Sequence, residues 1–278
     1  MSTPKATRPC AGWLAAALVA ACTTLGTAAP AGETPSDAQA LLADAFARRF
    51  EVDLTSEVEL VMRDAAGREH RRVFDAASKM IDGRLHSLGR LSWPSYLRNM
   101  TILTIEQAGR NHDAFVYLPS TGRVRRISTA QRGDAFFGTD VTYEDLERRH
   151  ADELVVEGMT HGRYQGEPAY VVRARATARL SFERAEYVLA EHDLAILEMR
   201  YYREGAETPH RVIRSPRAGM RQQGGHLVPS VLVVENRARG TTTTATFRQL
   251  AIDPEIDSRI FSTGMLARDR KGAKGVGR

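Results

Sequence analysis

Alternation of apolar and polar residues in short segments is the feature that most limits what this chain can fold into. In residues 52–62 (VDLTSEVELVM), acidic and hydroxyl side chains alternate with apolar ones at Val52, Leu54, Val58, Leu60 and Met62. A period of two residues gives a β-strand one dry face and one wet face. The dry face must be buried, so the chain is expected to build a sheet around an apolar interior.

The same pattern recurs, and turn residues separate the segments at short intervals. Further strands are expected at 70–78, 101–107, 112–118, 123–127, 153–158, 168–175, 182–190, 194–202, 210–214, 228–237 and 241–250. Antiparallel strands with a single dry face must curl into a barrel, a sandwich or a strongly bent sheet. The pattern alone leaves open whether the interior is a packed core or a lined pocket.

One helix is expected ahead of the strands, at residues 36–50 (SDAQALLADAFARRF). Ser36 or Asp37 can cap it. Spacing of three and four residues places one stripe on its surface, formed by Leu41, Leu42, Ala45, Phe46 and Arg49. The helix is then either docked on the core or lies as a lid across a cavity.

Both ends of the chain differ from its body. Residues 1–31 resemble an export signal, with Lys5 and Arg8 before the apolar run 11–21 and small residues at 27–31. We therefore expect export to a bacterial periplasm. The alternative is a lipoprotein, because VAAC at 19–22 fits a loose lipidation motif that would anchor the chain through Cys22.

The excess of basic residues sits in this leader and in residues 267–278, a tail expected to be disordered. The body, residues 32–266, is nearly neutral and is expected to form one domain. It lacks the basic face typical of nucleic-acid binders. No catalytic motif is recognisable, and the eight histidines are scattered singly. The expectation is a protein without catalytic residues, metal or cofactor.

A charged segment, residues 124–149, contains the adjacent Phe136 and Phe137. Thr142 and Asp145 have the spacing of a capping box for a short helix, YEDLERR. One interpretation is a loop and helix fixed by the two phenylalanines, which insert into the apolar interior. The other is a movable flap over a cavity mouth.

Residues 115–128 (FVYLPSTGRVRRIS) and 131–146 (QRGDAFFGTDVTYEDL) carry a specific resemblance. Their order of motifs is similar to the outer-membrane lipoprotein-sorting, LolA-like family, whose fold LolA, LolB and LppX share. The resemblance extends through 92–105 (SWPSYLRNMTILTI) and covers most of residues 40–265. It implies a mainly β protein: a curved antiparallel sheet of about ten or eleven strands, forming an incomplete barrel whose open side is plugged by helices.

The resemblance also implies a function, namely a periplasmic carrier whose concave apolar face accepts the acyl chains of a lipid or lipoprotein for sorting to the outer membrane. An inner-membrane transporter of the RND type is an implied partner. A different class of function stays open, an envelope adaptor or stress regulator that docks on a transporter. A hydrolase with an unrecognised site is a third reading.

The expected cavity lining combines this resemblance with the dry faces of the strands. It comprises Leu54, Val58, Leu60, Met62, Phe115, Tyr117, Phe136, Phe137, Leu197, Met199 and Tyr201. Arg125 and Arg126 are the expected contacts for a polar headgroup, because the planar guanidinium suits phosphate and carboxylate. Pairing of these arginines with acids inside the protein is the competing expectation.

Overall fold

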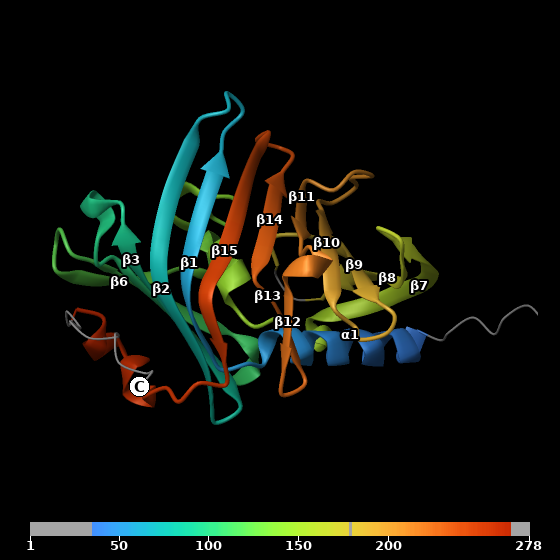
Figure 1. The fold of residues 1–278 in the computed structure, drawn as a ribbon, viewed down its shortest axis with the longest axis horizontal. Coiled ribbons are helices and arrows are strands. Elements are labelled where there is room, and N and C mark those ends of the chain that lie inside the picture. Colours follow the sequence, from blue (N-terminus) through green and yellow to red (C-terminus); the bar gives the residue numbers. More distant parts are fainter. Residues whose placement is uncertain (1–34, 178–179, 268–278) are drawn as a thin grey trace, which may run out of the picture. The chain divides into compact units, whose positions relative to one another are not determined.

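The computed structural model describes residues 35–177 and 180–267 (Figure 1). The leader predicted at 1–31, with its lipidation motif at Cys22, lies outside these residues. The basic tail beyond Ala267 lies outside them too. Within the described residues, no helix is long and apolar enough to cross a membrane.

Helix α1, Pro35–Phe50, confirms the predicted helix. Ala38, Leu42, Ala45 and Phe46 are buried and belong to one core cluster with strands from the second half of the chain. The ring of Phe46 packs edge-on against that of Tyr187, with centroids 5.1 Å apart. The apolar stripe read from the sequence is therefore the face by which α1 docks.

The strands form one large antiparallel sheet and one separate hairpin. The sheet order is β6-β5-β4-β3-β2-β1-β15-β14-β11-β10-β9-β8-β7. The bounds are β1 Leu54–Arg63, β2 Glu69–Ile81, β3 Arg84–Trp93, β4 Thr101–Glu106, β5 His112–Leu118, β6 Arg123–Ile127, β7 Leu154–Tyr164, β8 Glu167–Ala176, β9 Arg184–Ala190, β10 Ile196–Tyr202, β11 Arg211–Arg214, β14 Val231–Asn236 and β15 Thr241–Ile252. The hairpin pairs β12, Met220–Gln223, with β13, His226–Pro229.

The protein is mainly β and its sheet is antiparallel, as expected. With 13 strands, the sheet is larger than the ten or eleven strands that the family resemblance implies. It is also unclosed, because β6 and β7 are its two ends and do not pair with each other. Strand β3 was missed because RLHSLGRLSW spaces its leucines three apart and contains Gly89, so it shows no alternation. The hairpin was missed because β12 and β13 are only four residues each.

Short 3₁₀ turns connect the strands, and α1 is the only α-helix in the described part of the chain. The turns between strands are η1 Ser95–Leu97, η2 Ala108–Arg110, η3 Thr129–Gln131, η4 Phe136–Gly138, η5 Tyr143–Leu146, η6 Ala151–Glu153 and η7 Arg217–Gly219. Two more, η8 Ser258–Ile260 and η9 Thr263–Met265, follow β15. The helix predicted at YEDLERR is thus the single turn η5. It ends at Leu146, before the arginines expected in its last turn.

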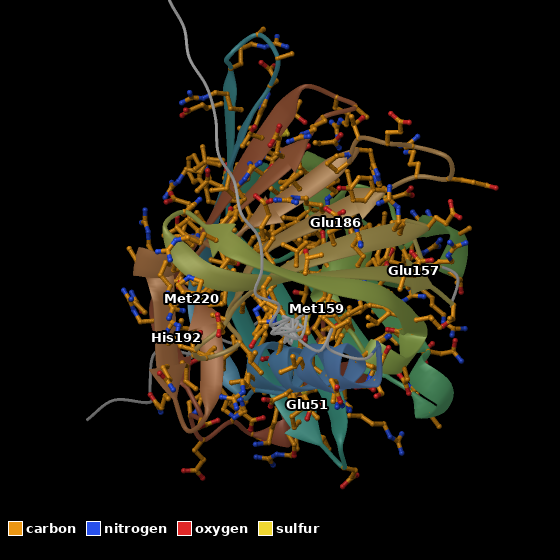
Figure 2. The ribbon with its side chains drawn as sticks, turned by 90° about the vertical axis from the view of Figure 1, so that its right-hand side faces the viewer. Glu51, Glu157, Met159, Glu186, His192 and Met220 are labelled. Atoms are coloured by element: carbon orange, nitrogen blue, oxygen red, sulfur yellow. The ribbon has the colours of Figure 1, made fainter. Side chains whose placement is uncertain are left out.

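The two faces of the sheet differ in chemistry. Over β10, β11 and β14 the outward side carries a ladder of ion pairs, in which Arg214 bridges Glu198 at 2.7 Å and Glu235 at 2.9 Å. Glu186, labelled in Figure 2, extends this ladder through Arg200 at 3.1 Å. The opposite side is apolar and contributes to the core clusters. This contrast fixes the strand register, because a slip of one residue would exchange the two faces.

Candidate ligand-binding cavity

An apolar cavity of about 270 Å³ lies against the inner face of the sheet. Its wall is built by strands from both halves of the chain, with side chains that include Leu54, Val58, Leu60, Phe74, Ile102, Met199, Ile213, Leu232 and Phe247. The last residues of α1 and parts of the segment 136–149 complete the lining. The volume lies close to the lower end of the usual range for ligand pockets, about 300–1,000 Å³.

The segment Phe136–Arg149, here called the cover segment, is fixed to the wall by aromatic packing. Phe136 is 3 % exposed, and its ring lies 5.3 Å from that of Phe74 on β2. It also contacts Phe137 at 4.5 Å and Tyr143 at 5.7 Å between ring centroids. The expectation that the two phenylalanines enter the apolar interior is confirmed for Phe136, whereas Phe137 is half-buried at the edge of the cluster.

Buried hydrogen bonds also hold the cover segment. The Asp140 carboxylate accepts hydrogen bonds from Thr241 Oγ1 at 2.5 Å and Thr243 Oγ1 at 2.8 Å, both on β15. Arg211 on β11 donates from Nε to the Asp140 carbonyl oxygen at 3.1 Å and from Nη1 to Asp145 at 3.0 Å. Asp145 in turn accepts from Thr142 N and Oγ1 at 2.7 and 3.0 Å, as the predicted capping box requires.

The acidic side chains of the cover segment that line the cavity each contact an arginine. Glu144 pairs with Arg149 at 2.9 Å, and the Glu147 carboxylate receives Arg132 Nε at 2.9 Å on both oxygens. Burial raises the pKa of Glu147, although Arg132 opposes this effect. The acids therefore belong to internal ion pairs, which resist dissociation because separating them would leave buried charges.

Arg49, in the last turn of α1, is the exception among the charged groups of the lining. It is 8 % exposed and donates from Nη1 to Ser215 Oγ at 3.0 Å. Its guanidinium also lies 5.3 Å from the Phe50 ring centroid. Burial lowers the pKa of Arg49 to about 10, so it stays charged at neutral pH.

Three solved structures share this fold. A domain assigned to outer membrane lipoprotein sorting, from Vibrio parahaemolyticus, matches with a TM-score of 0.77 at 17 % identity, over 84 % of this chain and 100 % of that chain. A DUF1329 family protein from Desulfovibrio piger matches with a TM-score of 0.75 at 20 % identity, over 83 % of this chain and 98 % of that chain. A LolA superfamily protein from Nitrosomonas europaea matches with a TM-score of 0.64 at 16 % identity, over 82 % of this chain and 98 % of that chain.

A protein-family model described as "uncharacterized protein" matches residues 84–268, well over half of the chain. The chain belongs to this family, and its fold is LolA-like. At these identities the structural likeness establishes the fold alone. No curated protein matches the sequence. The resemblance read from residues 115–146 is thereby confirmed at the level of the fold.

The LolA-like sheet brings together only part of the expected lining. Six of the eleven residues line the cavity, namely Leu54, Val58, Leu60, Phe136, Met199 and Tyr201. Met62 and Phe137 are outside the lining. Phe115 and Tyr117 occupy the other face of β5 and pack in a cluster with Phe261 and Leu266. The sequence pattern did not show which face of β5 is inward, because both faces carry large apolar side chains.

Leu197 departs from Met199 and Tyr201 for a geometric reason. Three odd positions of one strand are expected to share a face. The pairing of β10 with β9 shifts between Ile196 and Glu198, and such a bulge re-aims side chains. Leu197 is therefore packed in a different cluster, with Val188 and Leu227.

The two predicted headgroup contacts are not in the cavity lining. Arg125 and Arg126 are exposed on the edge strand β6, and Arg126 forms an ion pair with Asp113 on β5. The arginines that line the cavity are Arg49 and Arg149, and the sequence pattern predicted neither as a site residue. Arg149 is paired with Glu144, whereas Arg49 contacts no acid in the described part of the chain. A signal was present, because an arginine within the apolar stripe of a helix starts from the face that is turned to the core.

The chemical composition of the lining indicates which kind of ligand the cavity can hold. Among the described residues, no group of three histidine, cysteine or acidic side chains is placed to hold a metal ion. The lining is mostly aliphatic and aromatic, with its acids committed to arginines. The arrangement suits an apolar ligand with a small polar end.

Proposed function

We propose that this chain is an exported, non-enzymatic carrier that binds the acyl chains of a lipid or lipoprotein in its cavity and moves them through the periplasm toward the outer membrane. The observation that supports this proposal most is the apolar cavity between the sheet and the cover segment. A sheet whose inner face packed solid would have no room for a hydrocarbon tail.

The energetics suit a carrier. An acyl chain of about 16 carbons gains on the order of 12 kcal/mol on leaving water, at about 0.8 kcal/mol per methylene. Such a chain does not cross an aqueous compartment unaided at a useful rate. A carrier needs a dry surface, a cover and a fit loose enough for release, and it needs no catalytic group.

In this proposal α1 and the cover segment plug the open side of an incomplete barrel. This part of the proposal is supported by the lining, to which α1 contributes Phe50 and the cover segment contributes Phe136. Ligands longer than the cavity then require displacement of one of these two elements. The cover segment is held to the sheet through Asp140, and α1 is held through its buried apolar face.

Two measurements test carriage. Native mass spectrometry of protein purified from a membrane-containing host is expected to show bound acyl species, and delipidated protein is expected to take up a fluorescent fatty acid. The proposal fails if the protein is free of lipid and takes up no fatty acid.

A matched pair of variants locates the site. Ala76 on β2 lines the cavity and is half-buried, so Ala76→Phe fills space that a ligand needs. Ala66, exposed in the β1–β2 turn, accepts the same substitution outside the cavity. We expect Ala76→Phe to weaken fatty-acid binding by about tenfold or more, which is about 1.4 kcal/mol. Ala66→Phe is expected to bind like the unaltered protein.

Docking to a membrane transporter, with the RND type as the expected class, is a second candidate activity that is compatible with the first. It is favoured by two exposed aromatic side chains, Trp93 at 50 % and Tyr96 at 75 %, since exposed aromatic residues are enriched in protein interfaces. A photo-crosslinking residue in place of Tyr96 is expected to capture one dominant membrane protein in cells. An adaptor without carrier function would give that capture with no bound lipid.

A further inference from the structure

Arg49 is a buried cation without a contacting acid. Its hydrogen bond to Ser215 Oγ uses one of the five N–H donors of the guanidinium. Among the described residues, no carboxylate lies within ion-pair distance of it. Among the carboxylates, Asp145 has the largest electrostatic effect on Arg49, yet Asp145 is itself bound by Arg211.

The other charges of the lining balance within pairs. These pairs are Glu144 with Arg149, Asp145 with Arg211, and Glu147 with Arg132. Burial, together with the positive charge of Arg132, lowers the pKa of the nearby His112 to about 4, so His112 adds no charge at neutral pH. The positive charge of Arg49 is thus the one in the described lining that no acid neutralises by contact.

A buried charge without a partner is costly, and proteins normally pair or solvate such groups. A favourable interaction with the helix dipole does not account for Arg49, because Arg48 already supplies a cation in the same last turn. Arg48 is half-exposed and forms an ion pair with Asp44 at 3.0 Å. An apolar stripe position would accept leucine or methionine at lower cost. The cation therefore calls for an anion that is absent when the cavity is empty.

We propose that Arg49 binds the anionic headgroup of the acyl ligand, a carboxylate or a phosphate monoester, at the α1 end of the cavity. This inference rests on the proposed carrier function and adds the class of ligand. The hydrocarbon tail extends from there along the apolar wall of β1, β2 and β14. Arginine suits both headgroups because its planar fork donates two parallel hydrogen bonds to two oxygens.

The selectivity of the protein tests this assignment. Binding of palmitate and of lysophosphatidic acid is compared by calorimetry with binding of hexadecanol, which has a tail of the same length and no charge. Because a hydrogen bond to a charged group contributes more than a neutral one, we expect the anionic ligands to bind about 10- to 100-fold more tightly. Acetate and inorganic phosphate, which lack the tail, are expected to bind too weakly to detect.

Three variants identify the residue responsible. Arg49→Gln is expected to bring palmitate to within about threefold of hexadecanol, with hexadecanol affinity unchanged. Arg49→Lys is expected to keep part of the preference. Arg48→Gln, the matched control one residue earlier on α1, is expected to keep all of it. Circular dichroism establishes that each variant is folded.

The outcomes separate this inference from the carrier function. If the unaltered protein binds palmitate and hexadecanol equally, or if Arg49→Gln retains the preference, the headgroup assignment is wrong while the carrier function stands. If it binds neither ligand, both are wrong. Should Arg49→Gln not fold, the comparison of the two ligands on the unaltered protein still decides.

Discussion

The Asp140 carboxylate accepts a hydrogen bond from the Thr243 hydroxyl at 2.8 Å, and the Asp140 backbone N–H donates to the same hydroxyl oxygen at 2.9 Å. Thr243 is completely buried and Asp140 is 2 % exposed. This reciprocal contact joins the cover segment to β15, in the middle of the sheet. The cover is thereby positioned by the strands that form the cavity wall.

Removal of this contact is expected to loosen the cover and destabilise the protein. In Asp140→Ala, the hydroxyls of Thr241 and Thr243 lose their acceptor while they stay buried. Each unsatisfied group costs about 1–3 kcal/mol, so we expect the free energy of unfolding to fall by about 2–4 kcal/mol in urea denaturation. Asp134→Ala, on the exposed part of the same loop, is the control and is expected to change little. Equal stability of the two variants would contradict the role of Asp140.

The adjacent phenylalanines are expected to differ sharply in their contribution to stability. Phe136 is 3 % exposed against Phe74, whereas Phe137 is half-buried and has a left-handed backbone with φ +47°. Phe136→Ala should lower the free energy of unfolding by about 3–5 kcal/mol, as for other buried aromatics. Phe137→Gly loses less packing and relieves the backbone strain, so it should cost clearly less. Denaturant titration of both variants decides the order.

His112 is expected to make stability depend on pH. Its side chain is buried, and neither ring nitrogen has a hydrogen-bond partner among the described residues. Burial and the charge of Arg132 lower the pKa of His112 to about 4. His112 therefore takes up a proton near pH 6.5 in the unfolded chain but only near pH 4 in the folded chain. Because the unfolded state binds more protons between these values, the free energy of unfolding falls as the pH drops from about 6.5 toward 4.

The variant His112→Phe should remove this part of the slope. In the unaltered protein, His112 is expected to lower the free energy of unfolding by about 3 kcal/mol between pH 7 and pH 4, at 1.36 kcal/mol per pKa unit. At pH 7 the variant should be as stable as the unaltered protein or more so, because it deletes buried polar atoms without partners. Glu147, 3.7 Å from His112 Nδ1, has a raised pKa and acts in the opposite direction in both proteins. Parallel stability–pH curves for the two proteins would show that His112 does not titrate as described.

The sequence was most informative where one physical rule acted alone. The strands β4, β5 and β6 were located to within a residue, because short alternating runs were bounded by turn residues. The capping box of Thr142 and Asp145 was also predictable, since it depends on residues three apart. Local rules of this kind need no knowledge of the rest of the fold.

The cavity could be predicted only in part, because it depends on long-range geometry. The bulge that turns Leu197 away from Met199 comes from the pairing of β10 with β9, which no single segment encodes. Phe115 and Val116 are both large and apolar, and only the assembled fold shows that Phe115 packs with Phe261 whereas Val116 packs in the cluster of Phe136. The lack of an acidic partner for Arg49 could not be predicted either, because it depends on the pairing of the nearby acids with other arginines.

The last prediction concerns the two arginines of β6, which stay the alternative headgroup contacts. Arg125 and Arg126 are exposed, and the exposed pair of Arg126 with Asp113 contributes at most about 1 kcal/mol to stability. The double variant Arg125→Ala and Arg126→Ala should therefore lower the free energy of unfolding by at most about 1 kcal/mol. It should leave the palmitate affinity within about twofold of that of the unaltered protein. Because Arg49 lines the cavity and these two side chains do not, only Arg49→Gln should abolish the preference for an anionic ligand. Calorimetry on both proteins makes the comparison, and loss of the preference in the double variant would move the headgroup from α1 to β6.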